Sequence, residues 1–292
     1  MAQSKGHLGT AFLCMFVCGL VVSKPAWGVE FAGGTGEPND PYQVATAQQL
    51  ISIGSDWALA RKHYVLAASI DLSGVNLSEP VIGSFSGTFD GKGHTIRNLR
   101  VEGGIRSGLF GFILSGAEVR NLGVIDARVV GIGYPGGLAS NNFGSVLNCY
   151  STGVVIGTVH SGGGLIGYNN GTVANSHSAA QVSGSSYLGG LVGENMGTVS
   201  SCYFTGEVTG YGAVGGLVGF NAREIIWSYC VATVTGLAWE VGGLAGYNGG
   251  TITETVAALQ GVFSPSGLWL DDISEKRVSW RYGHGWPRKL CG

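Results

Sequence analysis

Acidic side chains are the first candidates for chemistry, because two carboxylates on one face of a protein can cleave a polysaccharide by acid–base catalysis. Asp71, Asp90, Glu118 and Asp126 are scattered ahead of residue 132. From residue 132 to 261 the acids share no common spacing; they are Glu194, Glu207, Glu224, Glu240 and Glu254. We therefore predict no catalytic residues. Asp90, within Phe-Asp-Gly, is expected to be a turn residue that bonds its own backbone. A polysaccharide-acting lyase or hydrolase is kept as the alternative function.

The histidines and the glycine-rich segments do not predict a metal or a cofactor. A shared metal ion needs ligands at a defined spacing, which the histidines after residue 28 lack; these are His63, His94, His160, His177 and His284. No His-Glu-x-x-His motif occurs, and no Lys-Ser or Lys-Thr pair follows the glycines as a phosphate loop requires. We expect neither a metal nor a cofactor.

A repeated motif determines where the remaining candidates lie. Gly-Gly-Leu recurs with its leucine at Leu138, Leu165, Leu191, Leu217 and Leu244, after a degenerate copy at Leu109, in steps of 29, 27, 26, 26 and 27 residues. This is the spacing of a solenoid. The high glycine content disfavours helical repeats and suits short strands joined by tight turns. Each unit is predicted to form one coil of parallel strands, about 4.8 Å from the next coil.

Fixed positions within the unit predict its inside and its turns. Asparagine follows each leucine by four residues, at Asn142, Asn169, Asn195, Asn221 and Asn248, and is expected to form a ladder. The glycine two residues further on, which Arg223 replaces after Asn221, suggests an Asn-x-Gly turn with positive φ. β-Branched residues eight and seventeen positions after the leucine, such as Val199 and Val208, are expected to fill the core.

Position twelve of the unit offers the one surface feature with binding potential. It holds Tyr150, His177, Tyr203 and Tyr229 in successive units. If position eleven points inward, strand alternation turns these rings outward as an aromatic column. The column could contact sugar rings or a partner protein, or it could only stabilise the stack of strands.

The cysteines after residue 28 do not form a disulfide framework. Cys149 and Cys202 share position eleven but lie two units apart, about 9.6 Å, which exceeds the reach of a disulfide. Small buried side chains explain these positions better. A bond between Cys230 and Cys291 stays open.

The motif Gly-Gly-Leu-Val-Gly-x-Asn-x-Gly, with the following Ser201-Cys202-Tyr203-Phe204-Thr205-Gly206, resembles the GLUG repeat of bacterial secreted and surface proteins. The segment from Phe85 to Leu99 resembles the stretch that precedes such repeats. The resemblance implies a right-handed β-helix, and its family includes adhesins and peptidase-associated regions.

The two ends of the chain differ from the repeats. Residues 1–28 have an apolar run, Leu8 to Val22, before small residues, which predicts a signal peptide and export to the cell envelope or beyond. Residues 29–64 are predicted to be an N-terminal cap with a short helix, since Thr46-Ala47-Gln48-Gln49 matches a capping box. Residues 262–292 contain Trp269, Trp280 and Trp286 and are predicted to be an irregular C-terminal cap rather than an aromatic binding surface.

The charge balance also limits the partners. The chain has 16 basic and 18 acidic residues, a formal net charge of −2, and no basic stripe, so a nucleic-acid partner is not expected. No membrane span is predicted after residue 28. The sequence predicts an all-β protein, a parallel β-helix of about seven or eight coils over residues 65–261, clearest from 132 to 261, and the resemblance implies that this helix is right-handed. Its predicted function is that of a non-catalytic secreted or surface scaffold for adhesion or ligand binding, with a polysaccharide or a surface protein as partner.

Overall fold

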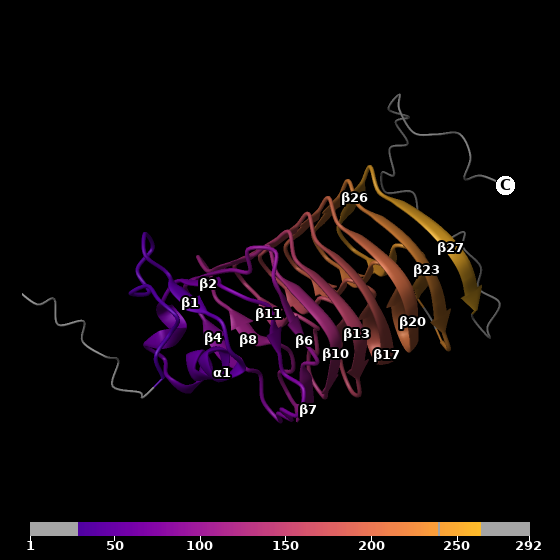
Figure 1. Ribbon diagram of the computed structural model, residues 1–292. Coiled ribbons are helices and arrows are strands. Elements are labelled where there is room, and N and C mark those ends of the chain that lie inside the picture. The colour runs from indigo at the N-terminus through magenta and orange to yellow at the C-terminus, as the bar shows by residue number, and fades with distance from the viewer. Residues whose placement is uncertain (1–28, 239, 264–292) are drawn as a thin grey trace, which may run out of the picture. The chain divides into compact units, whose positions relative to one another are not determined.

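The computed structural model describes residues 29–238 and 240–263. The predicted signal peptide and nearly all of the predicted C-terminal cap lie outside these residues. The compact unit begins at Phe31, and its strands form three parallel sheets that repeat along the chain (Figure 1). Among the described residues, no helix has the length and the apolar composition that a membrane crossing requires.

Each coil contributes one strand or strand group to each sheet, in a fixed order. The first strand of a coil joins sheet I, which contains β4 (Ile82–Phe85), β8 (Phe110–Ile113), β11 (Ala139–Asn142), β15 (Ile166–Asn169), β18 (Val192–Asn195), β21 (Val218–Asn221) and β25 (Ala245–Asn248). The second joins sheet II, which contains β1 (Tyr42–Val44), β2 (Tyr64–Leu66), β5 (Thr88–Asp90), β9 (Glu118–Arg120), β12 (Ser145–Leu147), β16 (Thr172–Ala174), β19 (Thr198–Ser200), β22 (Glu224–Ile226) and β26 (Thr251–Thr253).

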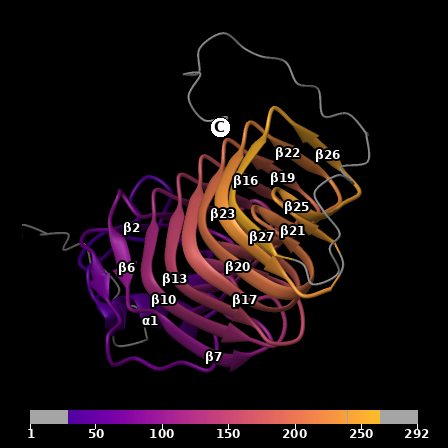
Figure 2. The ribbon, with the colours of Figure 1, turned by 90° about the vertical axis from the view of Figure 1, so that its right-hand side faces the viewer.

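The third part of each coil joins sheet III, which contains β3 (Ile70–Asp71), β6 (Thr95–Arg97), β7 (Arg100–Gly104), β10 (Gly123–Gly131), β13 (Tyr150–Gly157), β14 (Gly162–Gly163), β17 (His177–Gly189), β20 (Tyr203–Gly215), β23 (Tyr229–Gly236), β24 (Val241–Gly242) and β27 (Val256–Phe263). Figure 2 shows the strands of each sheet following one another from the indigo to the yellow part of the chain. From β4 to β27 the described residues complete seven three-sheet coils. The prediction of an all-β parallel solenoid with about seven coils is confirmed.

The repeated apolar positions form the core, as predicted. Leu138, Leu165, Leu191 and Leu217 are fully buried, whereas Leu244 in the last described coil is half-buried. Positions eight and seventeen, represented by Val199 and Val208, are also buried. The first coils replace small side chains with rings, because Tyr64, Phe85, Phe89 and Phe110 pack with centroids 5.4–6.3 Å apart. One continuous apolar core therefore runs through all the coils.

The predicted N-terminal capping helix is present as α1 (Ala47–Ser55). Both hydrogen bonds of the capping box form, since Thr46 Oγ1 accepts from the Gln49 backbone and Gln49 Oε1 accepts from the Thr46 backbone. The helix buries Leu50 and Ile53 and packs against β4, the first strand of sheet I. A 3₁₀ turn, η1 (Leu59–Arg61), follows it. The sequence did not predict β1, which pairs with β2 and starts sheet II inside the cap.

The predicted asparagine ladder is also present. From β11 to β25, position four of each coil lies in register with position four of the next, and each asparagine Nδ2 donates to the following Oδ1 at 2.7–2.8 Å. The Oδ1 atoms of Asn142, Asn169 and Asn195 also accept the backbone N–H two residues further on, at 3.1–3.3 Å. These three amides and that of Asn221 are fully buried. A polar group at this depth is tolerated because its neighbours in the adjacent coils satisfy it.

The prediction that Asn-x-Gly needs positive φ is wrong. Gly144, Gly171, Gly197 and Gly250 all lie outside the left-handed region. A Cβ on Gly197 would instead lie 2.1 Å from the carbonyl oxygen of Gly171 in the preceding coil, so this glycine permits two backbones to approach. Left-handed residues instead recur at position ten, at the corner between sheets II and III: Asn148, Asn175, Ser201, Trp227 and Glu254.

Replacing Asn195 with Leu tests the ladder, because Leu has a similar volume and no hydrogen-bonding group. The change removes the bond from Asn169 and leaves the Asn221 Oδ1 and the Gly197 N–H without their partner, and we expect the free energy of unfolding to fall by about 2–6 kcal/mol, as measured by denaturant titration. The matched control is Asn248→Leu at the exposed end of the ladder. Its loss should be about 1 kcal/mol. Equal losses in the two variants would contradict a buried, coupled ladder.

Candidate functional site

The structure brings the four predicted column residues together. Tyr150, His177, Tyr203 and Tyr229 are partners in consecutive strands of sheet III. Their ring centroids are 5.0, 4.4 and 4.9 Å apart, and the planes of neighbouring rings differ by only 2–5°. Position eleven points inward as expected, since Cys149, Ser176, Cys202 and Ser228 are buried. The residues at position twelve therefore lie on the outer face.

The way in which the rings stack determines what the column can bind. Each interior ring has both faces against its neighbours, and Tyr150 at one end lies over Gly123 of the preceding coil. A sugar that stacks on an aromatic residue needs an open face. The column therefore presents ring edges, with the tyrosine hydroxyls and the imidazole nitrogens, rather than stacking platforms. Burial lowers the pKa of His177, which favours a neutral ring between the tyrosines.

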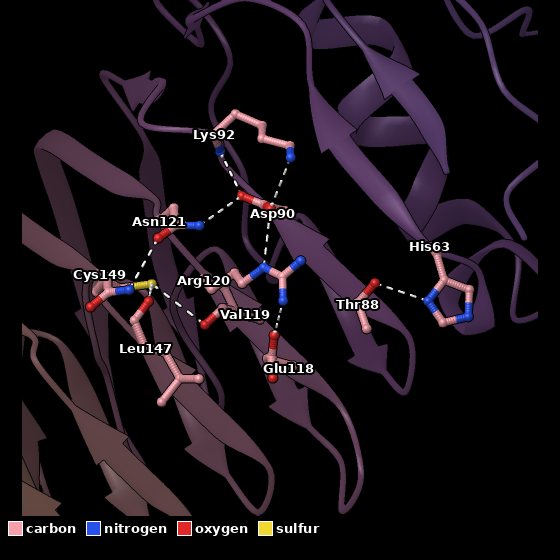
Figure 3. A network of polar contacts seen from close by, with 11 residues as sticks. His63, Thr88, Asp90, Lys92, Glu118, Val119, Arg120, Asn121, Leu147 and Cys149 are labelled. Atoms are coloured by element: carbon pink, nitrogen blue, oxygen red, sulfur yellow. Dashed lines mark hydrogen bonds and ion pairs between the residues drawn. The ribbon is translucent and has the colours of Figure 1, made fainter. Parts of the chain in front are cut away.

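Two of the acidic residues considered as candidates, Asp90 and Glu118, share an ion-pair partner in the described part of the chain. Arg120 lies between them, with Nε 3.0 Å from Asp90 Oδ2 and Nη1 2.6 Å from Glu118 Oε1 (Figure 3). Asp90 Oδ1 accepts the Lys92 backbone N–H at 2.8 Å, which confirms the predicted turn role, and the Asn121 side chain at 3.0 Å. Asp90 and Arg120 are partners on adjacent strands, β5 and β9.

The hydrogen bonds of this cluster favour the ionised form of Asp90. Burial raises the pKa of Asp90, but the hydrogen bonds from Asn121, the Lys92 backbone and Arg120 outweigh it, and the net shift is downward. A carboxylate with a lowered pKa stays ionised at neutral pH and is a poor general acid. Asp71 binds Ser73 and Asn98 in sheet III, and the backbone N–H of Asp126 donates to Thr152.

The cysteines behave as small core residues. Cys149, Cys202 and Cys230 are free and buried, and burial raises the pKa of each thiol to about 12. A protonated thiol of this kind is a weak nucleophile. Cys291 lies outside the described residues, so the bond to Cys230 that the sequence left open is not tested. No group of three or more His, Cys, Asp or Glu side chains within the described ranges could hold a metal ion.

A second row of outward side chains, on sheet I, was missed by the sequence analysis. It occupies position three of each coil and contains Phe112, Asn141, Tyr168, Glu194, Phe220 and Tyr247. The frequent aromatic residues at this position are visible in the sequence. Their neighbours from the corners between sheets III and I, such as Tyr134 and His160, come from segments of variable length and could not be aligned.

The Asp90 cluster predicts a stability that depends on pH. Because the folded-state pKa of Asp90 is lowered, its stabilisation is present above the unfolded-state pKa of about 3.9 and is lost as the pH falls through the folded-state value. Asp90→Asn should lower the free energy of unfolding by about 1–3 kcal/mol at pH 7 and by clearly less under strongly acidic conditions, in denaturant titrations. Glu102→Gln, which removes the exposed ion pair with Arg128, is the control and should cost less than about 1 kcal/mol. A loss for Asp90→Asn that is independent of pH would contradict this account.

Comparison with known proteins identifies a recognised motif within the repeats. The family model described as the GLUG motif matches residues 184–209, which extend from β17 into β20. The halomucin of Haloquadratum walsbyi (strain DSM 16790 / HBSQ001) is 32% identical over 170 residues, which is 53% of this chain but only 2% of the halomucin.

Two solved structures share the fold. A Bacteroides ovatus protein described as "a putative immunoglobulin A1 protease" aligns with a TM-score of 0.62 and 24% identity over 79% of this chain and 80% of its own. A structure described as IgA1 protease aligns with a TM-score of 0.51 and 18% identity over 75% of this chain and 21% of its own. At these identities the likeness concerns the fold. The predicted GLUG repeats are confirmed, and the chain is a parallel β-solenoid that carries the GLUG motif.

Proposed function

We propose that this protein is a secreted or cell-surface scaffold that uses the outer faces of its coils for adhesion or ligand binding, without catalysis. The observation that carries the proposal is the aromatic column, in which polar ring edges recur once per coil in strict register. A repeating row of this kind fits a ligand that is itself repetitive, such as a polysaccharide, or an extended surface of a partner protein. The predicted signal peptide supports export.

The scaffold role follows from how the coils hold their outward side chains. Parallel strands of successive coils pair in all three sheets, and the buried asparagines connect the coils from within. Side chains at one repeat position are therefore held about 4.8 Å apart along the solenoid. Many weak contacts at a fixed spacing can give strong binding without any deep pocket.

The column has a structural contribution that must be separated from binding. Each stacked aromatic pair stabilises a fold by about 0.5–1.5 kcal/mol, so removing the rings would weaken the solenoid whether or not they touch a ligand. The hydroxyl groups can be removed without the rings. Tyrosine to phenylalanine changes therefore isolate the proposed binding role.

The direct test is to screen the purified protein on an array of glycans and polysaccharides while assaying the same samples for released reducing ends and unsaturated products. We expect binding without turnover. Turnover would overturn the scaffold proposal in favour of a polysaccharide-acting enzyme. Absence of binding to every glycan and to surface-protein preparations would contradict a ligand-binding role.

The triple variant Tyr150→Phe, Tyr203→Phe and Tyr229→Phe should weaken binding of the ligand found in that screen at least about tenfold, since about 1.4 kcal/mol of lost hydrogen bonding corresponds to this factor. Its melting temperature should stay close to that of the wild type, because the stacked rings remain. The corresponding triple serine variant should lose both binding and stability. Unchanged binding by the phenylalanine variant would show that the column is only structural.

A further inference from the structure

The outward row of sheet I surrounds one carboxylate with aromatic rings. Glu194 in β18 has Tyr168 as its partner on one side and Phe220 on the other. Side chains at such positions project from the same face, about 4.8 Å apart. Glu194 is half-buried, so its charge is partly removed from water.

The rings around Glu194 are arranged differently from those of the column. Tyr134, from the corner that precedes β11, meets Tyr168 at 67° with centroids 5.6 Å apart, and Tyr187 meets Phe220 at 80° and 5.6 Å. The planes of rings that meet at steep angles face different directions, whereas parallel rings cover one another's faces. His160 adds a further ring to this group, since its ring stacks on Tyr134 with centroids 6.4 Å apart.

Glu194 is held in place but has no positive partner in the described part of the chain. The fully buried Ser161 donates a hydrogen bond to Glu194 Oε1 and fixes the direction of the carboxylate. None of the ion pairs formed by the described residues includes Glu194. Burial, and then the negative charge of Glu194, raises the pKa of Tyr134, whose hydroxyl stays protonated and neutral. Within the described residues, the Glu194 carboxylate therefore has aromatic neighbours and no cationic partner.

The same row already holds one organic cation. At its beginning, the guanidinium carbon of Arg106 lies 4.2 Å from the ring centroid of Phe112. A cation over an aromatic face is attracted by the negative face of the ring, and the attraction grows when water is excluded. The site around Glu194 offers rings together with a carboxylate, and no described arginine forms an ion pair with it.

We propose that Glu194, Tyr168 and Tyr134 form a binding site for an organic cation, an alkylammonium or guanidinium group. The group could belong to a lysine or arginine side chain of a partner protein or to a small free amine. A neutral sugar would leave the carboxylate without a counter-charge, so the site differs in ligand class from the column on sheet III. The inference does not depend on the proposed function, because the column variants leave sheet I unchanged.

Choline and its neutral carbon isostere, 3,3-dimethylbutan-1-ol, are the decisive pair of probes. They have nearly the same shape, and only choline carries a charge. Titrations of the whole protein, followed by NMR of the tyrosine and phenylalanine rings, should show choline binding at least tenfold more tightly than the isostere. N-acetyl-lysine methylamide and a short lysine-containing peptide distinguish the two sources. Tighter binding of the peptide supports a partner side chain, and equal or weaker binding supports a free amine.

The matched variants are Glu194→Gln and Glu207→Gln. Glu194→Gln should weaken choline binding about tenfold and should make choline and the isostere nearly equal, with little change in melting temperature. Glu207→Gln, on sheet III, should leave binding unchanged. Tyr168→Leu should also weaken binding, and Glu194→Gln keeps the test valid if the leucine variant is unstable. The proposal is overturned if the two probes bind equally to the wild type, if Glu194→Gln has no effect, or if neutral oligosaccharides shift the same ring signals.

Discussion

The repeats from β11 to β25 depend on the hydrogen bonding of one asparagine amide per coil, which is fully buried in all but the last of these coils. An asparagine in an apolar core is costly unless its donors and acceptor are satisfied. Here the satisfaction comes from the neighbouring coils, since Asn195 Nδ2 donates to Asn221 Oδ1 and Asn195 Oδ1 accepts from Asn169. A shift of one coil by one residue would break these bonds and would also turn core side chains outward. The ladder therefore fixes the register of the coils from β11 to β25.

That register determines what the surface can do. Outward side chains at one repeat position line up along the solenoid as a row. The residue types in that row determine which side-chain surfaces other molecules can contact. On sheet III the parallel rings of the aromatic column cover one another and expose their edges. On sheet I, Tyr134 and Tyr168 meet at a steep angle beside Glu194, as do Tyr187 and Phe220, although Phe220 also stacks on Tyr247. Two faces of one scaffold thus have different chemistry, although the same backbone geometry holds both.

The sequence was sufficient to predict features that recur at a constant position. The core leucines, the asparagine ladder, the inward small residues at position eleven and the column at position twelve all follow from the repeat and from strand alternation. The capping box of α1 was predicted because its signal is local. These features need only the spacing along the chain.

Features that depend on irregular corners or on packing between backbones were not predictable in this way. The sequence suggested positive φ at the glycine of Asn-x-Gly, because glycine tolerates this conformation. In the structure these glycines have no positive φ and instead allow a close approach to the backbone of the preceding coil. The cluster of Asp90, Arg120 and Glu118 needs a register that the degenerate early repeats do not show. The Ser161 contact of Glu194 arises from a corner whose length varies between units.

Hydrogen exchange of the asparagine side-chain amides, observed by NMR, tests the central role of the ladder most directly. Each Nδ2 group that donates inside the core should exchange slowly, so Asn142, Asn169, Asn195 and Asn221 should be strongly protected. Asn248, which is exposed, should exchange rapidly. Rapid exchange at all five positions would contradict the account, because the coils would then lack the internal bonds that set their register.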